Sequence, residues 1–357
     1  MRCLPLPFPL FALACILAGC SPPAADTPAP PPANATSGNT AAEGNGPAPS
    51  AGGTLRIGMM PKGKGIPYFN ACEKGAREAA KELGDVELVY DGPSEDRSDA
   101  QSTMLDTWIL KKFDAITVAC NDPDQIAPTL SRARDAGITT VTYDADANAA
   151  SSKRQFFVNQ AGVGEIAHAL VDEMAKQAGE DAKVAVVSSS STAPNQNSWL
   201  DAMAVYMKEK YPRMIIVATE YAQENQKLSQ EKAQSILKAN PEVKGIWGMT
   251  SKAFPGAAQA VERAGKSGQV AVVGLGTPTE MKEFVDRGVV KSVILWNPVD
   301  LGYLTIQVAR AVARGELKEG ATTFNAGRLG EKKIEKDVIL LGKPMVFDKD
   351  NIGQFDF

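Results

Sequence analysis

From Thr54 onward, short apolar runs alternate with longer segments in which apolar residues recur at helical spacing. The strand-like runs are LRIGMM (55–60), VELVYDG (86–92), AITVAC (115–120), TTVTYDAD (139–146), KVAVVSSSS (183–191), IIVATEY (215–221), GIWGMT (245–250), VAVVGLG (270–276) and SVILW (292–296). Helical spacing covers 66–84, 99–112, about 126–136, 162–178, 196–210, 228–239, 254–265, 278–287 and 300–314. Strands that alternate with helices in this way predict parallel sheets covered by helices on both faces.

The chain has 357 residues, which is enough for two domains of ordinary size. We therefore expect an α/β protein with two Rossmann-like lobes. Because right-handed crossovers place every strand-to-helix loop at one edge of a parallel sheet, ligand-binding residues are expected just after the strands.

The N-terminal segment, residues 1–20, has the features of a bacterial lipoprotein signal. Arg2 is followed by an apolar stretch over 10–17, which is too short to span a bilayer as a helix. The stretch ends in LAGC (17–20), so we predict that Cys20 is lipidated and becomes the first residue of the mature chain. An ordinary secretory signal with an unrelated cysteine is the alternative.

Residues 21–53 consist mainly of Pro, Ala, Ser, Thr, Gly and Asn, without apolar periodicity. Such a segment buries too little apolar surface to offset the entropy of ordering it. We expect a disordered tether between a membrane and the folded part, in the periplasm or cell envelope. A glycosylated stalk is the alternative.

Charge and residue types exclude several functions. The net charge is −4, and the basic residues are scattered along helical segments, which argues against a nucleic-acid surface. His168 is the only histidine and falls within a helical pattern, which removes Ser-His-Asp chemistry and histidine-based metal sites. We expect no enzymatic activity, no catalytic residue, no cofactor and no metal.

Two cysteines remain once the signal and Cys20 are set aside. Cys72 falls in a helical pattern and Cys120 ends a strand pattern. We expect two buried free thiols. A disulfide is the alternative, since an exported compartment permits one.

Candidate ligand-binding residues follow the strands of the first half. Lys62 comes after the first strand and can donate charge-assisted hydrogen bonds. Tyr68 and Phe69 offer flat apolar faces to a sugar ring, unless they serve only in helix packing. Asp144 follows a later strand, and its carboxylate can accept two hydrogen bonds from vicinal hydroxyls, unless it only caps a turn.

Further candidates follow the strands of the second half. Asn195 and Gln196 carry amides that both donate and accept, although Asn195 is also a candidate helix cap. The remaining candidates at strand ends are Tyr221, Ser251, Trp296 and Asn297. Hydroxyl and amide groups, aromatic rings and a carboxylate are typical of a pocket that binds a small polyol.

At these residues the chain resembles the ribose-type periplasmic binding proteins of ABC importers, and within them the rhamnose-binding and autoinducer-2-binding members. The resemblance covers about 55–357 and is carried by the order and spacing of PKGKGIPYF (61–69), VYDGP (89–93), TYDAD (142–146), FVNQ (157–160), PNQNSW (194–199), VVGLGTP (272–278), LWNPVDLGY (295–303) and FDKDNIGQFDF (347–357).

The resemblance implies two lobes joined by three crossing segments, with a small sugar bound in the cleft. It implies an N-lobe of 54–158 plus about 298–325 and a C-lobe of 159–297 plus about 340–357. The crossings are expected near 158–160, 297–298 and 322–342. A monomer is expected, with an ABC permease or a chemoreceptor as its partner.

An autoinducer-2 receptor on the same fold is the first competing hypothesis. By position, Lys62, Asp144, Asn195, Gln196, Met249 and Ser251 fall where those members touch their ligand. The chain departs from that pattern, which has aspartate at Asn195 and proline and alanine at Met249 and Ser251. Gly276 also stands where ribose-binding members have an aspartate, whereas LWNPVDLGY favours a rhamnose-like member.

Two hypotheses from other classes are opposed by the sequence. An NAD-dependent oxidoreductase would need a third glycine in the GLGTP segment (274–278). A sugar-responsive transcription regulator would need an N-terminal helix-turn-helix, where this chain has the predicted lipobox and tether.

Overall fold

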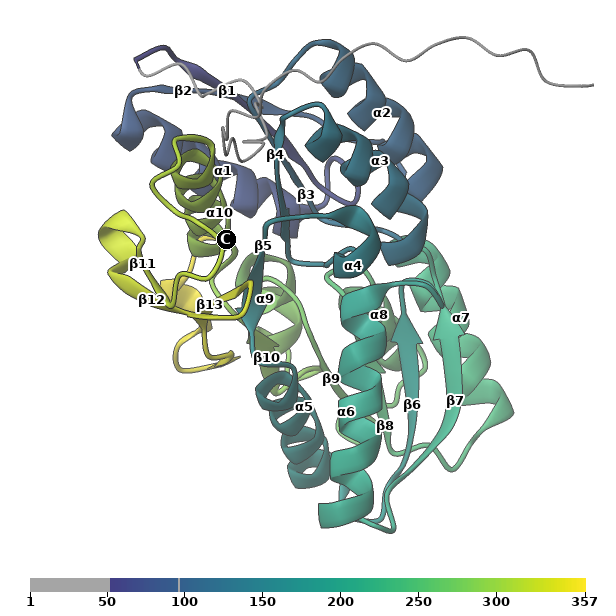
Figure 1. Ribbon diagram of the computed structural model, residues 1–357. Coiled ribbons are helices and arrows are strands. Elements are labelled where there is room, and N and C mark those ends of the chain that lie inside the picture. The colour runs from purple at the N-terminus through teal and green to yellow at the C-terminus, as the bar shows by residue number, and fades with distance from the viewer. Residues whose placement is uncertain (1–51, 96) are drawn as a thin grey trace, which may run out of the picture. The chain divides into compact units, whose positions relative to one another are not determined.

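The computed structural model describes residues 52–95 and 97–357, which fold into two α/β lobes (Figure 1). The predicted fold class is therefore confirmed. The predicted signal sequence, the lipidation of Cys20 and nearly all of the predicted tether lie outside the described residues. None of the helices in the described ranges combines the length and apolar character needed to cross a bilayer.

The N-lobe is built on a sheet with the strand order β11-β12-β13-β5-β4-β3-β1-β2. Its strands are β1 (Leu55–Met60), β2 (Val86–Tyr90), β3 (Ala115–Val118), β4 (Thr139–Tyr143), β5 (Phe156–Ala161), β11 (Thr323–Asn325), β12 (Glu331–Glu335) and β13 (Val338–Gly342). Strands β1 to β5 and β13 run parallel, while β11 and β12 add antiparallel pairs at one edge.

Helices cover both faces of the N-lobe sheet. They are α1 (Pro67–Leu83) and α10 (Pro298–Ala313) on one face, α2 (Ser98–Leu110) and α3 (Pro123–Asp135) on the other, and the short α4 (Ala149–Ser152) and η1 (Gly327–Leu329). Pro67 and Pro298 stand at the starts of α1 and α10, where proline is favoured because its missing N–H would have no partner within the helix.

The C-lobe has a parallel sheet with the order β7-β6-β8-β9. Its strands are β6 (Lys183–Ser188), β7 (Ile215–Tyr221), β8 (Gly245–Gly248) and β9 (Ala271–Gly274), with β10 (Ser292–Leu295) beside β9 and paired antiparallel to β14 (Met345–Asp348). Its helices are α5 (Val163–Ala178), α6 (Pro194–Lys210), α7 (Gln226–Ala239), α8 (Ala253–Arg263), α9 (Pro278–Asp286) and η2 (Ile352–Gln354). Helix α5 packs beside α6, and α7 beside α8 (Figure 1).

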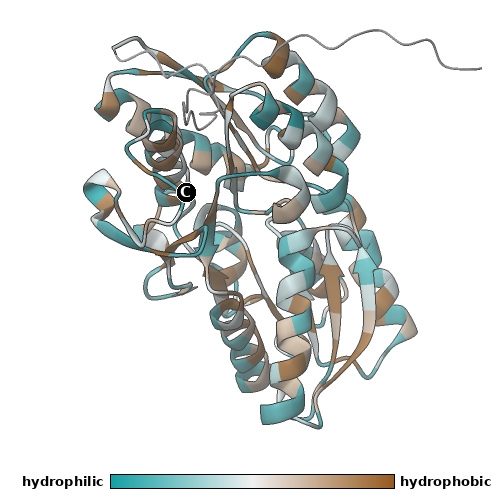
Figure 2. Ribbon diagram, viewed as in Figure 1, coloured by the Kyte–Doolittle hydropathy of each residue, from teal (hydrophilic) through white to brown (hydrophobic). Residues whose placement is uncertain are grey.

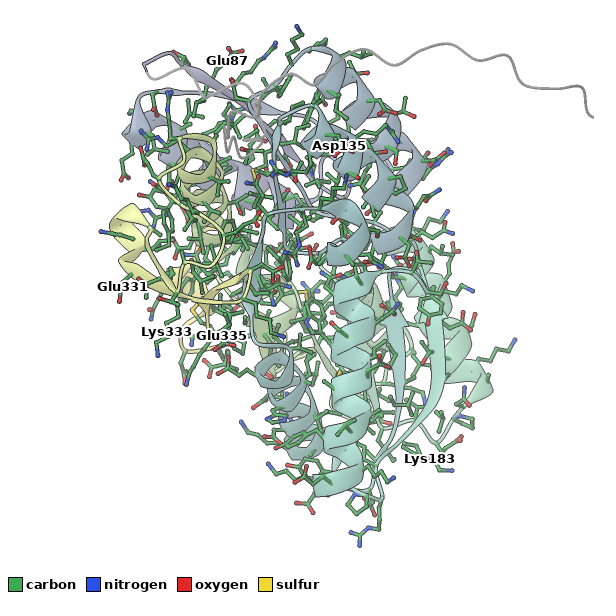
Figure 3. The ribbon with its side chains drawn as sticks, viewed as in Figure 1. Glu87, Asp135, Lys183, Glu331, Lys333 and Glu335 are labelled. Atoms are coloured by element: carbon green, nitrogen blue, oxygen red, sulfur yellow. The ribbon has the colours of Figure 1, made fainter. Side chains whose placement is uncertain are left out.

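The central strands are buried on both faces. Every residue of β3, β4, β8 and β10 is buried, and β3, β8 and β10 are mainly apolar runs without alternation. β4 is buried as well, although three of its five residues are threonines. Apolar colour accordingly concentrates on strands such as β6, whereas the helices carry hydrophilic colour as well (Figure 2). Charged side chains such as Glu87, Asp135 and Lys183 are exposed (Figure 3).

Two of the three segments that cross between the lobes lie at other residues than predicted. The first follows β5 and so begins after Ala161, slightly later than 158–160. The second, at Asn297–Pro298 between β10 and α10, lies where it was predicted. The third lies between β13 and β14, at 343–344, because β13 pairs in parallel with β5 and belongs to the N-lobe sheet. The N-lobe therefore continues to Gly342 instead of ending near 325.

Helices α1 and α10 approach each other closely at two glycines. A Cβ atom built on Gly75 would lie 1.7 Å from the carbonyl oxygen of Val299, and one built on Gly302 would lie 1.8 Å from that of Cys72. These contacts are with backbone atoms, so only glycine allows the two helices to pack at this distance.

Both remaining cysteines are free and buried, as predicted. Burial raises the pKa of the Cys72 thiol, and the nearby Asp144 charge raises it further. Burial likewise raises the pKa of Cys120. Because the thiolate is the reactive form, we expect neither thiol to react with a disulfide reagent such as DTNB in the native protein, and both to react in denaturant. Rapid native labelling of either residue would contradict this packing.

Candidate functional site

A cavity lies where strand ends of both lobes meet. Among the residues predicted from the sequence, it is lined by Lys62, Tyr68, Phe69, Asp144, Asn195, Gln196, Ser251 and Trp296. The cavity volume is about 40 Å³.

The N-lobe supplies a lysine, two aromatic rings and a carboxylate. Lys62 follows β1, and Tyr68 and Phe69 lie in the first turn of α1. Asp144 follows β4 with φ of 60°, a left-handed conformation that aspartate tolerates better than most residues. All four side chains are buried, even though Lys62 and Asp144 carry ionisable groups.

The C-lobe supplies two amides from the first turn of α6. Pro194 is the first residue of this helix, and Asn195 and Gln196 follow it directly. Ala193 stands at the cap position and makes no side-chain cap bond, so Asn195 is not the helix cap. Its amide points instead toward the N-lobe.

A chain of hydrogen bonds joins the two lobes across the cavity. The Lys62 Nζ group donates to Asn195 Oδ1 at 2.9 Å and to Gln196 Oε1 at 3.3 Å. Asn195 Nδ2 donates to Asp144 Oδ2 at 3.3 Å. Asn195 therefore bridges a buried ammonium and a buried carboxylate.

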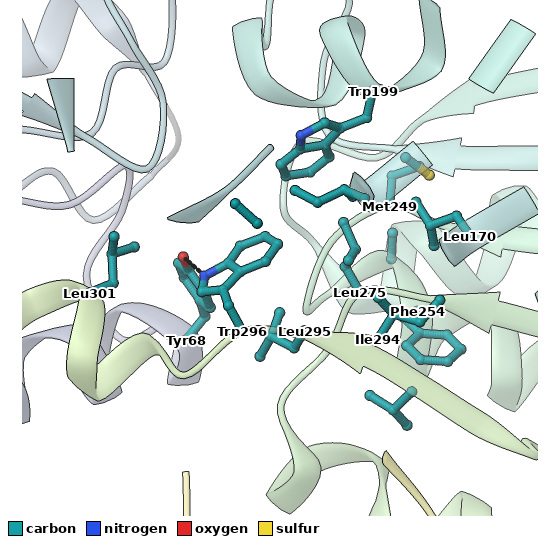
Figure 4. Close-up of a cluster of buried hydrophobic side chains, with 14 of the residues drawn as sticks. Tyr68, Leu170, Trp199, Met249, Phe254, Leu275, Ile294, Leu295, Trp296 and Leu301 are labelled. Carbon is teal, nitrogen blue, oxygen red and sulfur yellow. Dashed lines mark hydrogen bonds between the residues drawn. The ribbon is translucent and has the colours of Figure 1, made fainter. Parts of the chain in front are cut away.

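The other Asp144 oxygen is held by an aromatic pair. The Tyr68 hydroxyl donates to Asp144 Oδ1 at 2.7 Å and accepts a hydrogen bond from Trp296 Nε1 at 2.8 Å. Trp296 follows β10 directly, at the second crossing, and Figure 4 shows its indole beside the Tyr68 hydroxyl. The pair therefore connects the crossing to the Asp144 carboxylate.

Burial controls the charge state of these groups. It raises the pKa of Asp144 above its usual value of 3.8, while the Lys62 charge and the Tyr68 hydrogen bond oppose the shift. Burial is also the main cause that raises the pKa of the Tyr68 hydroxyl, and the Asp144 charge adds to it. Tyr68 thus remains a hydrogen-bond donor at any physiological pH.

Aromatic and aliphatic side chains form the rest of the wall. The rings of Trp199 and Trp296 lie with centroids 5.8 Å apart, and Tyr68 meets Trp296 edge-on at 6.0 Å. Met249 and Leu275 line the cavity from the C-lobe (Figure 4). Flat rings beside charge-bearing and amide groups suit a ligand with apolar C–H faces and a hydroxylated rim.

The sequence of residues 57–317 matches the family model described as a periplasmic binding protein domain. This match spans most of the chain. The chain belongs to this family of periplasmic binding proteins. The resemblance predicted from the sequence is therefore confirmed.

Curated relatives of this periplasmic binding protein include the D-allose-binding periplasmic protein of Escherichia coli, 26% identical over 245 residues, or 66% of this chain and 77% of that protein. A solute-binding protein of an ABC transporter from Clostridium phytofermentas, solved with bound L-rhamnose, is 31% identical with a TM-score of 0.80 and covers 84% of this chain and 98% of its own. A protein from Clostridium saccharobutylicum in complex with AI-2 is 24% identical with a TM-score of 0.79, covers 85% of this chain and 100% of its own, and shows the shared fold.

Two predicted residues lie elsewhere in this binding protein. Asn297 caps α10, because its Oδ1 accepts hydrogen bonds from the backbone N–H groups of Val299 at 2.9 Å and Asp300 at 3.3 Å. Tyr221 ends β7, which is an edge strand of its sheet, and the residue is 38% exposed. Neither residue lines the cavity.

Several lining residues were absent from the predicted set. They are Ile66, Trp199, Glu224, Thr250, Leu275 and Leu295, while Met249 was named only through the resemblance to autoinducer-2-binding members. Thr250 comes two residues after β8 and Leu275 one residue after β9. The expectation that ligand-binding residues follow the strands therefore identifies both. Trp199 lies six residues into α6, where a sequence pattern does not distinguish a cavity residue from a core residue.

We expect the substitution Tyr68→Phe to lower the free energy of unfolding by about 1–2 kcal/mol, because it leaves the buried Trp296 Nε1 group without its acceptor. Tyr143→Phe is the matched control, since the buried Tyr143 hydroxyl has no hydrogen-bond partner among the described residues. Its removal should be neutral or slightly stabilising. Urea unfolding of both variants measures the difference, and equal losses would contradict the role given to Tyr68.

Proposed function

We propose that this protein captures a small, rhamnose-like sugar in the cavity between its lobes and delivers it to the permease of an ABC importer, without catalysing a reaction. The observation that carries the proposal is the lining of the cavity. A buried carboxylate, an ammonium and two amides converge from both lobes beside four aromatic rings. Names of similar proteins agree, since they include allose- and ribose-binding proteins and a rhamnose complex.

In the proposed mode of binding, Asp144 accepts hydrogen bonds from ring hydroxyls and the α6 amides contact the sugar from the opposite lobe. The apolar faces of Phe69 and Trp296 pack against the ring C–H groups. Because the ligand touches both lobes, it favours the closed arrangement over an open one.

A thermal-shift screen of monosaccharides and related polyols tests the proposal, since a ligand that binds only the folded state raises the unfolding temperature. We expect L-rhamnose or a related deoxysugar or pentose to give the largest shift, followed by calorimetry for affinity. If no sugar binds while the purified protein releases autoinducer-2 activity in a bioassay, the competing receptor function is favoured.

We propose further that Cys20 carries the lipid that holds the protein to a membrane, because it ends the predicted lipobox. Mass spectrometry of the mature N-terminus should show the lipid on this residue. The substitution Cys20→Ser should release the exported protein into the soluble fraction, and retention of that variant in the membrane would contradict the assignment.

A further inference from the structure

Lys62 lines the cavity but directs its ammonium group at protein atoms. Its side chain is almost wholly buried, with 2% of the residue exposed. Both of its hydrogen bonds cross from the N-lobe to the C-lobe and end on the side-chain oxygens of Asn195 and Gln196. These are the two amides that face the proposed sugar site.

An ammonium group fixes which way an amide points. Lysine has three N–H donors and no acceptor, so the atom that faces Nζ must be the amide oxygen and not the nitrogen. The oxygen and nitrogen of an amide otherwise look alike, and either orientation would be open to it. Lys62 removes that freedom at both Asn195 and Gln196.

Two further contacts agree for Asn195. The backbone N–H of Gln196 donates to the same Oδ1 atom at 3.1 Å. The Asn195 Nδ2 group lies 3.3 Å from Asp144 Oδ2, and a carboxylate accepts hydrogen bonds but does not donate them. The ammonium on one side and the carboxylate on the other therefore require the same orientation. Turning the amide by 180° would place oxygen against oxygen and N–H against N–H.

We propose that Lys62 is a positioning residue. It orients the amides of Asn195 and Gln196 so that the α6 side of the cavity presents hydrogen-bond donors to the ligand. With both amide oxygens occupied, Asn195 and Gln196 present N–H groups to the ligand, while Asp144 presents acceptor oxygens. The inference rests on the proposed function and adds to it. The sugar offers oxygen lone pairs toward α6 and hydroxyl protons toward Asp144, so the site discriminates between sugars by hydrogen-bond polarity as well as by shape.

Side-chain amide NMR spectra of the sugar-free protein test the orientation without any ligand. The substitution Lys62→Met keeps the length of the side chain and removes the ammonium. We expect it to shift or broaden the NH₂ signals of Asn195 and Gln196, assigned with the variants Asn195→Asp and Gln196→Glu. Unchanged signals in Lys62→Met would overturn the proposal.

Lys64→Met is the matched control. Lys64 lies in the same loop, but its side chain is about half exposed and pairs with Asp91. We expect this substitution to leave both pairs of NH₂ signals in place. A general response of the cavity to any loop substitution would move them in both variants and would overturn the assignment to Lys62.

Calorimetry with L-rhamnose and its 2-, 3- and 4-deoxy and deoxyfluoro analogues tests the polarity. Fluorine accepts a weak hydrogen bond and donates none. For at least one ring position, the wild-type protein should bind the fluoro analogue several-fold more tightly than the deoxy analogue. For another position, it should bind both analogues about tenfold more weakly than L-rhamnose. In Lys62→Met the fluoro-to-deoxy difference should shrink, because Gln196 loses the contact that orients its amide while Asp144 still orients Asn195. An undiminished difference would overturn the polarity claim.

The two experiments separate the possible failures. If L-rhamnose does not bind, the proposed ligand is wrong, whereas the NMR result on the sugar-free protein still decides the role of Lys62. If L-rhamnose binds and every fluoro analogue binds as its deoxy partner does, the proposed function stands. The proposal that α6 presents hydrogen-bond donors to the sugar is then overturned.

Discussion

Replacing Asp144 with alanine is expected to weaken sugar binding by about 1.5–3 kcal/mol, or roughly tenfold to a hundredfold, because hydrogen bonds to a charged acceptor are the stronger ones. Its carboxylate is buried at the end of β4 and is held by the hydroxyl of Tyr68 and the amide of Asn195. Calorimetry with the best ligand from the screen measures the loss. Tyr221→Ala is the control, since that side chain does not line the cavity and should leave the affinity unchanged.

The same carboxyl makes sugar affinity depend on pH. Burial raises the pKa of Asp144 above 3.8, so protonation begins at a higher pH than for an exposed aspartate. A protonated carboxyl offers less acceptor capacity to sugar hydroxyls, so affinity should fall as the pH drops through the raised pKa. The amide that replaces the carboxyl in the variant Asp144→Asn does not titrate, and a fall of equal size in that variant would contradict the assignment.

The stability of the sugar-free protein should depend on pH in the opposite direction. A raised pKa means that the folded state holds the proton of Asp144 more tightly than the unfolded chain does. Its contribution to the free energy of unfolding is thus fully present below pH 3.8 and is lost as the pH rises through the raised pKa. The difference between wild type and Asp144→Asn in urea unfolding isolates this contribution from that of other groups.

Gly302→Ala is expected to lower the free energy of unfolding by about 3–5 kcal/mol, at the upper end of what single substitutions do. The new Cβ would lie 1.8 Å from the backbone oxygen of Cys72. Neither helix can relieve this contact by a side-chain rotation, so α1 and α10 must separate along the core of the N-lobe. Urea unfolding followed by circular dichroism measures the loss.

Gly164→Ala is the matched control for this substitution. Gly164 also lies within a helix, α5, but a Cβ built there meets no atom within 4 Å. Alanine has the higher helix propensity, so this variant should be neutral or up to about 1 kcal/mol more stable. A similar loss in both variants would show that the close approach of α1 and α10 does not limit stability.

The alternation of strands and helices was predictable because both faces of each parallel sheet are covered. Buried runs such as those of β3 and β8 are continuous and apolar, and helices at regular spacing separate them. The C-terminal strands β11 to β14 were not predicted. They do not alternate with α-helices, and β11 and β12 are mostly exposed, so neither alternation nor an apolar run marks them.

The cavity was partly predictable for the same topological reason. Asp144 and Trp296 follow strands directly and Lys62 comes two residues after one, and parallel topology brings such positions together. Tyr221 meets the same rule, but the rule does not say which strand lies at the edge of the sheet. Asn297 shows a second limit, since an amide after a strand serves equally well to cap the next helix.

The positions of the indole rings have a practical consequence. The chain has four tryptophans. Trp199 and Trp296 line the cavity, whereas Trp108 stacks on Phe113 and Trp247 donates to the backbone of Leu170, both away from it. A ligand in the cleft therefore changes the surroundings of Trp199 and Trp296 but not those of Trp108 and Trp247. Intrinsic tryptophan fluorescence can thus follow a ligand titration without an attached dye.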